Sequence, residues 1–265
     1  MLKRHTHWFV VLSFFLILLP IAYLLLMPNL SKLRKENPKK TALMEYRERA
    51  YKEKKKRYRM DQSWVPLSRI SPYLIKAVLI AEDDKFWRHE GFDYEAIQRA
   101  IEKDLKAKKF KSGGSTITQQ LARNLFLSPE KSLIRKISEA VITWRMEKVL
   151  SKRRILELYL NVAEWGEGIF GVDAASRHYY GKSSSELTPE EAARLAAILP
   201  NPRRYSPVGD QRYVINRSNL IYSIMIQRGI VIPEYKEVTE GLESPSEEPV
   251  SQAPVPKEGE GTEGK

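Results

Sequence analysis

Cysteine is absent from all 265 residues of this sequence. Its absence excludes disulfide bonds and metal sites built on thiolates, and the chain would tolerate an oxidising compartment. Histidine is scarce, and neither His89 nor His178 has the spacing of a metal ligand, so we interpret both as structural. The sequence also lacks an internal repeat and any run of alternating strands.

Charge is distributed unevenly around a net value of +12. Between Ser31 and Arg59 there are 13 Lys and Arg residues against 4 Asp and Glu. From Glu234 to Lys265 there are 9 Glu against 3 Lys, in a segment also rich in Pro, Ser and Gly. The basic block predicts that the N-terminal region lies against an anionic surface of a partner. The composition of the tail predicts disorder.

A single long hydrophobic run, Trp8–Met27, holds 20 residues without a charge. That length matches a bilayer core of ~30 Å, and no small-residue cleavage site follows it. We therefore predict an uncleaved transmembrane anchor at 8–27 after a short N-terminus at 1–7. Basic residues are more numerous after the run than before it, which by itself would place the body of the protein in the cytoplasm.

Composition divides the remaining chain into a basic juxtamembrane stalk, 28–63, a folded domain, 64–233, and an acidic disordered tail, 234–265. A solvated linker explains the stalk equally well. Apolar periodicity and capping residues predict the helices of the folded domain, which begin after Ser71, Asp93, Ser115 or Thr116, Ser132, Ser151, Thr188 and Arg212. We expect the apolar residues of the second of these helices, among them Ile101 and Leu105, to face the core.

The stretch Ala81–Gly91, AEDDKFWRHEG, places Glu82 and Asp83 at the end of an apolar helix. A general base must keep its proton affinity near the working pH, and partial burial beside Phe86 would raise the pKa of Glu82. A solvated or ion-paired acid is the ordinary alternative for any one such residue. The frame of Glu82, Asp83, Phe86, His89 and Gly91 favours a catalytic role.

Two further strings supply cations and helix ends. In Gly113–Asn124, GGSTITQQLARN, a glycine-hydroxyl turn opens a helix whose N–H groups suit a phosphate. In Arg135–Glu139, RKISE, an acid follows two cations, and Arg123 with these cations could clamp a pyrophosphate. A flexible connector, a solvated basic face and a plain helix salt bridge are the competing interpretations.

Taken together, these strings resemble the glycosyltransferase family 51 enzymes, the transglycosylases of peptidoglycan synthesis. The resemblance covers roughly Arg69 to Gly229 and also includes SKRRILELYLN, GVDAASRHYYGK, Glu164–Gly168 and Leu199–Pro202. The last two are similar to the monofunctional biosynthetic enzymes of Gram-negative bacteria.

The resemblance implies an all-α, lysozyme-like bilobal domain that polymerises lipid II outside the inner membrane. It implies that Glu82 is the base and that Glu139 organises the leaving-group side. The expected substrate-binding residues are Asp83, Phe86, Gly113, Ser115, Thr116, Gln119, Arg123, Asn124, Lys131, Arg135 and Lys136. No cofactor is expected to be required, although Mg²⁺ or Mn²⁺ is compatible with the leaving group.

The expected partners are lipid II, the growing glycan strand and membrane lipid. Cell-wall synthesis or division proteins are compatible further partners, and nucleic acid is not an expected partner. One rival function is a lytic transglycosylase or muramidase, whose glutamate would act as an acid on a glycosidic oxygen. Another is a membrane-tethered protein that binds anionic ligands through 31–59. The resemblance also implies a periplasmic catalytic domain behind a single-pass anchor. This is the opposite of the cytoplasmic location that the count of basic residues on either side of the hydrophobic run predicts.

Overall fold

The computed structural model describes residues 28–55, 57–107, 114–130 and 132–231. The predicted anchor at 8–27 and the predicted acidic tail at 234–265 lie outside this part of the chain. In the part that is described, every helix is too short or too polar to cross a bilayer.

The described chain is mainly helical, as the sequence predicts. Its α-helices are α2 (Ala42–Glu53), α3 (Pro72–Glu82), α4 (Tyr94–Ala107), α5 (Ile117–Phe126), α6 (Leu133–Val149), α7 (Lys152–Val162), α8 (Val172–Tyr180), α9 (Pro189–Ile198) and α10 (Arg212–Gln227). Short 3₁₀ helices are η1 (Leu30–Arg34), η2 (Leu67–Arg69) and η3 (Ser184–Glu186). The strands are β1 (Asp61–Gln62), β2 (Glu164–Gly166) and β3 (Ile169–Phe170).

Side-chain caps set most of these helix starts. Asp93 Oδ1 accepts a hydrogen bond from Ala96 N at 2.9 Å, and Thr188 with Glu191 forms the predicted capping box of α9. Ser71 precedes Pro72 as predicted, but its hydroxyl donates to the carbonyl of Leu187 at 3.0 Å. That contact ties the start of α3 to the start of α9.

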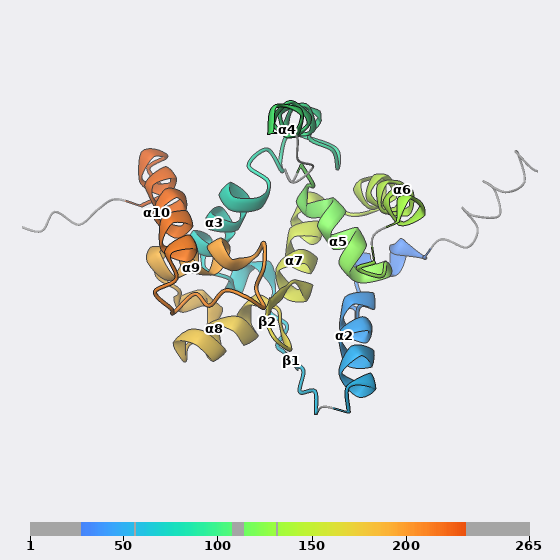
Figure 1. Ribbon diagram of the computed structural model, residues 1–265, viewed down its shortest axis with the longest axis horizontal. Helices are drawn as coiled ribbons and strands as arrows, with labels where there is room; N and C mark the ends of the chain where they lie inside the picture. The colour runs from blue at the N-terminus through green and yellow to red at the C-terminus, as the bar shows by residue number, and fades with distance from the viewer. Residues whose placement is uncertain (1–27, 56, 108–113, 131, 232–265) are drawn as a thin grey trace, which may run out of the picture. The chain divides into compact units, whose positions relative to one another are not determined.

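The core lies where α7 and α9 bury nearly all their apolar side chains and α3 buries one face. α3 packs on α9, α9 packs on α10, and α5 packs on both α6 and α7 (Figure 1). Leu74 and Val78 of α3 and Leu156 of α7 are fully buried. The end of α3 lies at the first turns of α5, because Asp83 accepts a hydrogen bond from Ile117 N and Glu82 accepts one from Gln120.

A three-stranded sheet in the order β1-β3-β2 was not expected from the sequence. β1 runs parallel to β3, and β2 runs antiparallel to it. Gly171 follows β3 with a φ of +81°, and a Cβ there would lie 2.7 Å from the carbonyl oxygen of Asn161. Strands of two or three residues are too short to produce a detectable alternation in the sequence.

Folded structure begins well before Trp64, which corrects the boundary predicted there. Leu30 and Leu33 of η1 join the main core, and Leu43 and Met44 of α2 form a second cluster with Phe170. α2 has few apolar residues because it buries only a narrow stripe, against α5 and the sheet. Residues 28–62 are thus part of the domain and not a separate stalk.

The expectation that α4 faces the core is also wrong. None of its described side chains is buried, and Ile101 and Leu105 are 55% and 64% exposed. On α6 the apolar residues Leu133, Ile134, Ile137 and Trp144 are exposed as well. Periodicity shows that a helix face is apolar, but it does not show what covers that face.

Candidate active site

Glu82 is the last residue of α3, and its side chain is only 11% exposed. Gln120 Nε2 of α5 donates to Glu82 Oε2 at 2.9 Å, and Arg217 Nη2 of α10 lies 3.5 Å from Oε1. Tyr159 of α7 donates its hydroxyl to Gln120 Oε1 at 3.1 Å. Three helices therefore hold one carboxylate in place.

Burial raises the pKa of Glu82 above its ordinary value, and this effect exceeds the opposing influence of Gln120, Arg217 and Arg123. A carboxylate with a raised pKa holds a proton more strongly and is a better general base. The position predicted for a base thus has the electrostatic character that a base needs.

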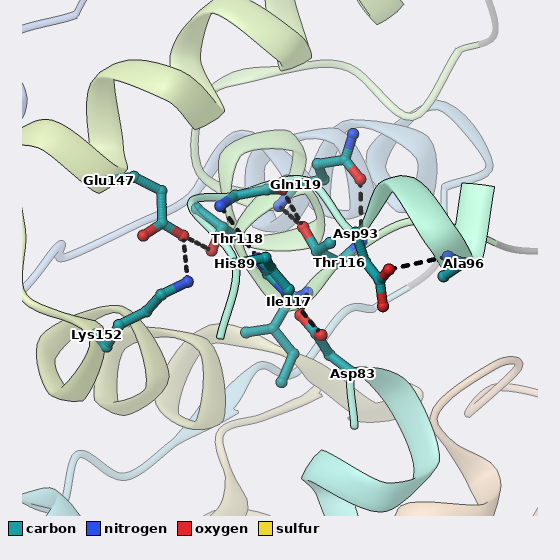
Figure 2. Close-up of polar contacts among 11 residues, drawn as sticks. Asp83, His89, Asp93, Ala96, Thr116, Ile117, Thr118, Gln119, Glu147 and Lys152 are labelled. Carbon is teal, nitrogen blue, oxygen red and sulfur yellow. Dashed lines mark hydrogen bonds and ion pairs between the residues drawn. The ribbon is translucent and has the colours of Figure 1, made fainter. Parts of the chain in front are cut away.

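Asp83, the next residue, has a structural role in this arrangement. Its Oδ2 accepts a hydrogen bond from Ile117 N, the first residue of α5, at 2.9 Å. Its Oδ1 lies 2.8 Å from His89 Nε2, and Gly91 N donates to His89 Nδ1 at 3.1 Å. Because Nδ1 is an acceptor, Nε2 carries the proton that is shared with Asp83. Figure 2 shows this carboxylate beneath the start of α5.

The N-terminus of α5 is occupied by its own side chains, which corrects the expectation of a phosphate at this helix end. Thr116 Oγ1 accepts from Gln119 N, while Gln119 Oε1 accepts from Thr116 N (Figure 2). The Thr116 hydroxyl also donates to the carbonyl of Gly91 at 2.7 Å. With Ile117 N bound to Asp83, the backbone N–H groups of Thr116, Ile117 and Gln119 are already paired.

Neighbouring groups stabilise the junction between the end of α3 and the start of α5. Thr118 Oγ1 donates to Glu147 Oε1 at 2.6 Å, and Lys152 Nζ lies 2.8 Å from the same oxygen. Lys152 Nζ also stands 4.5 Å from the ring centroid of Phe86, which is fully buried. Asp83, Phe86, Thr116 and Gln119 therefore build the frame that holds Glu82 against α5, and the structure shows them directed into the protein.

A cavity of about 300 Å³ opens beside Gln120. Three guanidiniums line it, from α2, α5 and α6 respectively: Arg47, Arg123 and Arg135. Its remaining lining comprises Leu43, Asn124, Leu127, Pro129, Tyr159, Ala163, Glu164, Leu199 and Pro202. Gln120 contacts both Glu82 and this cavity, so the candidate base and the cation cluster belong to one site.

Glu139 is completely buried in α6. Arg135 Nη1 donates to its Oε2 at 2.6 Å, and Lys136 donates to its other oxygen. Lys136 is half exposed, whereas Arg135 is largely covered and its Nε is buried without a partner in the described residues. The pair predicted as a helix salt bridge is present, and its carboxylate is at the same time removed from water.

The described residues do not fit a resident metal ion. Both oxygens of Glu139 are engaged by cations. No group of three or more histidine and acidic residues comes together within the described ranges. We therefore derive no catalytic step through a protein-bound metal.

Of the predicted site residues, Glu82, Arg123, Asn124, Arg135, Lys136 and Glu139 cluster along α3, α5 and α6 around the cavity and its rim. Ser115 is partly exposed just before the α5 cap. Gly113 and Lys131 lie outside the described residues.

Sequence reasoning did not select Tyr159, Arg217, Arg47 or Glu164, which the fold adds to the site. Tyr159 lies on a fully apolar helix face and Arg217 lies 135 positions from Glu82, so no local spacing could connect them. Gln120 lies in the GGSTITQQLARN string, and its one-turn spacing from Arg123 and Asn124 indicates that these side chains share one face of a helix.

Comparison with known proteins agrees with this geometry. A family model described as transglycosylase matches residues 48–226. A biosynthetic peptidoglycan transglycosylase of Azoarcus sp. is 58% identical over 172 residues, which is 65% of this chain and 74% of the relative. One of Nitrosospira multiformis is 49% identical over 194 residues, covering 73% and 84%. One of Janthinobacterium sp. is 43% identical over 220 residues, covering 83% and 94%. The chain belongs to the transglycosylase family.

Proposed function

We propose that this protein is a peptidoglycan glycosyltransferase that polymerises lipid II into glycan strands. Glu82 removes the proton from the 4-hydroxyl of the acceptor GlcNAc as its oxygen attacks C1 of the donor MurNAc. The bond between C1 and the pyrophosphate oxygen breaks, and the electron pair leaves with the pyrophosphate. Inversion at C1 converts an α-linked donor into a β-linked product.

The observation that carries this proposal is a desolvated carboxylate joined through one glutamine to a cavity lined by guanidiniums. A base and an anion-stabilising surface on either side of a reacting carbon are what this transfer requires. Positive charge that is already in place stabilises the charge developing on the leaving group without further rearrangement.

The two buried glutamates have different surroundings, which suits different roles. Glu82 accepts its main hydrogen bond from a neutral amide, whereas Glu139 is paired with two cations. We therefore assign the proton transfer to Glu82. Glu139 positions Arg135 and Lys136 for the leaving group.

The membrane arrangement belongs to the same proposal. The exposed apolar residues of α4 and α6 would form the membrane-touching face of a smaller lobe, with Lys103 and Lys106 near lipid headgroups. An anchor at 8–27 would hold the domain on the periplasmic side of the inner membrane, where the lipid II substrate is exposed. A lysozyme-like bilobal shape would place the cleft above that face.

A lytic transglycosylase or muramidase is the rival that uses the same glutamate. Such an enzyme cleaves a neutral glycosidic bond and has no anionic leaving group to stabilise. The three guanidiniums beside Gln120 favour the synthase.

The deciding experiment supplies the full-length protein in detergent with lipid II or with preformed glycan strands. We expect strand growth from lipid II and no shortening of preformed glycan. The Glu82→Gln variant should lose ~10²–10⁴-fold in rate, the usual effect of removing a positioned base. Glu90→Gln, an exposed glutamate in the same turn region, should retain the wild-type rate.

Residual turnover of Glu82→Gln above about a hundredth of wild type would remove Glu82 from the role of base. Shortening of preformed glycan without strand growth would support the lytic enzyme instead. Parallel reactions with EDTA and with added Mg²⁺ or Mn²⁺ test the expectation that no cofactor is required.

A further inference from the structure

α2 contributes directly to the wall of the active-site cavity. Leu43 and Arg47 both line it, together with residues of α5 and α6. α2 lies beside α5 in the structure (Figure 1). Leu43 and Met44 anchor the helix on Phe170 of β3. Leu43 and Arg47 precede the part of the chain matched by the family model, which begins at residue 48.

Arg47 is held in a fixed orientation. Its Nε lies 3.1 and 3.2 Å from the two carboxylate oxygens of Glu164, and its Nη2 donates to Oε2 at 2.7 Å. The Arg47 side chain is 22% exposed and that of Glu164 only 6% exposed. This bidentate pair uses one edge of the guanidinium, and Nη1 makes no hydrogen bond within the described residues.

The charge and lining of the cavity indicate the kind of ligand it takes. Three guanidiniums face one carboxylate, which leaves an excess of two positive charges. Leu43, Leu127 and Leu199 make other parts of the wall apolar. A diphosphate diester carries two negative charges, which matches this excess, and guanidiniums bind phosphate oxygens through charge-assisted hydrogen bonds.

We propose that α2 is a wall of the donor diphosphate site and that Arg47, held by Glu164, binds the diphosphate together with Arg123 and Arg135. This inference rests on the proposed function, because it assigns the anion to the leaving group of that reaction. It makes the segment before the family-matched region part of the catalytic unit.

A purely structural role for Arg47 has different consequences. If the pair with Glu164 only fastens α2 to the sheet, removing either partner has the same effect on stability and on ligand binding. If Arg47 binds the ligand, the two partners differ. Glu164→Gln keeps the cation and removes a carboxylate whose negative charge opposes an anion in the cavity, whereas Arg47→Gln removes the cation itself.

The test measures the binding of inorganic pyrophosphate and of farnesyl diphosphate to the full-length protein by calorimetry, with a thermal melt of each variant. We expect Arg47→Gln to weaken both ligands about tenfold or more, as loss of a charge-assisted hydrogen bond does. Glu164→Gln should bind both at least as tightly as wild type, although its melting temperature falls as that of Arg47→Gln does. Arg49→Gln, an exposed arginine on the same helix, should match wild type in both measurements.

Equal binding by Arg47→Gln and wild type would overturn the inference, and so would equal weakening by Arg47→Gln and Glu164→Gln. If Arg47→Gln does not fold, Arg47→Lys replaces it, and weakened binding with a retained fold is the supporting result. Lipid II polymerisation by the wild type separates the two proposals. A wild type that binds diphosphate through Arg47 without polymerising lipid II would refute only the proposed function.

Discussion

At the scale of single residues, Glu82 and Glu139 show how much a local string can tell. Both lay in recognisable strings, and both are buried carboxylates in the structure. The string could not show that Gln120, Tyr159 and Arg217 surround Glu82, since these residues come from three helices far apart in sequence. Residue type was therefore predictable from the chain, whereas the environment that sets the pKa required the fold.

Burial of Glu82 has a consequence for stability as well as for catalysis. Its raised pKa means that the folded protein binds this proton more tightly than the unfolded chain does. The stabilising contribution of this carboxyl is fully present below its unfolded pKa and is lost as the pH rises through the folded pKa. We expect Glu82→Gln to melt at a higher temperature than wild type at pH 8, with the difference shrinking toward pH 4.5, the ordinary glutamate value.

Thermal melts of both proteins across this pH range check the expectation. Glu90→Gln is the matched control, because Lys148 lowers the pKa of that exposed carboxyl and no such gain should appear. A Glu82→Gln protein that melts below wild type at pH 8 would show that the carboxylate is net stabilising and not desolvated.

At the scale of elements, helix starts were predictable and the partners of helix faces were not. Caps at Asp93, Thr116 and Thr188 are local chemistry and appear where expected. The packing of α2 and the exposure of α4 depend on surfaces supplied by distant segments. Thr116 caps α5, as one of the two predicted alternatives, but Asp83 accepts the hydrogen bond from Ile117 N at the helix end where the sequence predicts an anion.

The junction of α3 and α5 is accordingly a sensitive point. Asp83→Ala leaves Ile117 N and His89 without their acceptor in a buried setting, which we expect to cost about 3 kcal/mol of the free energy of unfolding. Activity should fall as well, because Gln120 follows Ile117 on α5. Denaturant unfolding measures the first effect and lipid II turnover the second.

Asp84→Ala is the comparison for this change. That carboxylate is 49% exposed in its pair with Arg228, so its loss should cost less than about 1 kcal/mol. Equal stability of the two variants would mean that Asp83 does not hold the junction.

At the scale of the whole molecule, the N-terminal third contains segments of different kinds. Residues 1–27 precede the described chain, whereas η1 and α2 are built into the domain through Leu30, Leu33, Leu43 and Met44. We expect a protein lacking 1–27 to keep the wild-type stability in detergent. A protein lacking 1–53 should lose about 4 kcal/mol or more, since four buried apolar side chains are removed with it.

Denaturant unfolding of the three forms tests this difference. Removal of 1–27 should also slow polymerisation at low enzyme concentration on lipid II vesicles, because a tether raises the effective concentration at the surface. Equal stability of the two truncated proteins would restore the stalk interpretation of 28–63.

The docking of the N-terminal segment also sets an order of events during synthesis. Arg154 Nε donates to the carbonyl of Leu33 across 121 positions, and Arg47 meets Glu164 across 117. The first contact cannot exist until the ribosome has reached α7, which contains Arg154, and the second cannot exist until it has passed α7, so η1 and α2 must wait while their partners are translated. Contacts between such distant positions close large loops and are slow to form. The first part of the domain to be made thus completes its packing only after the middle of the chain has been synthesised, and the cavity wall that α2 provides is finished with it.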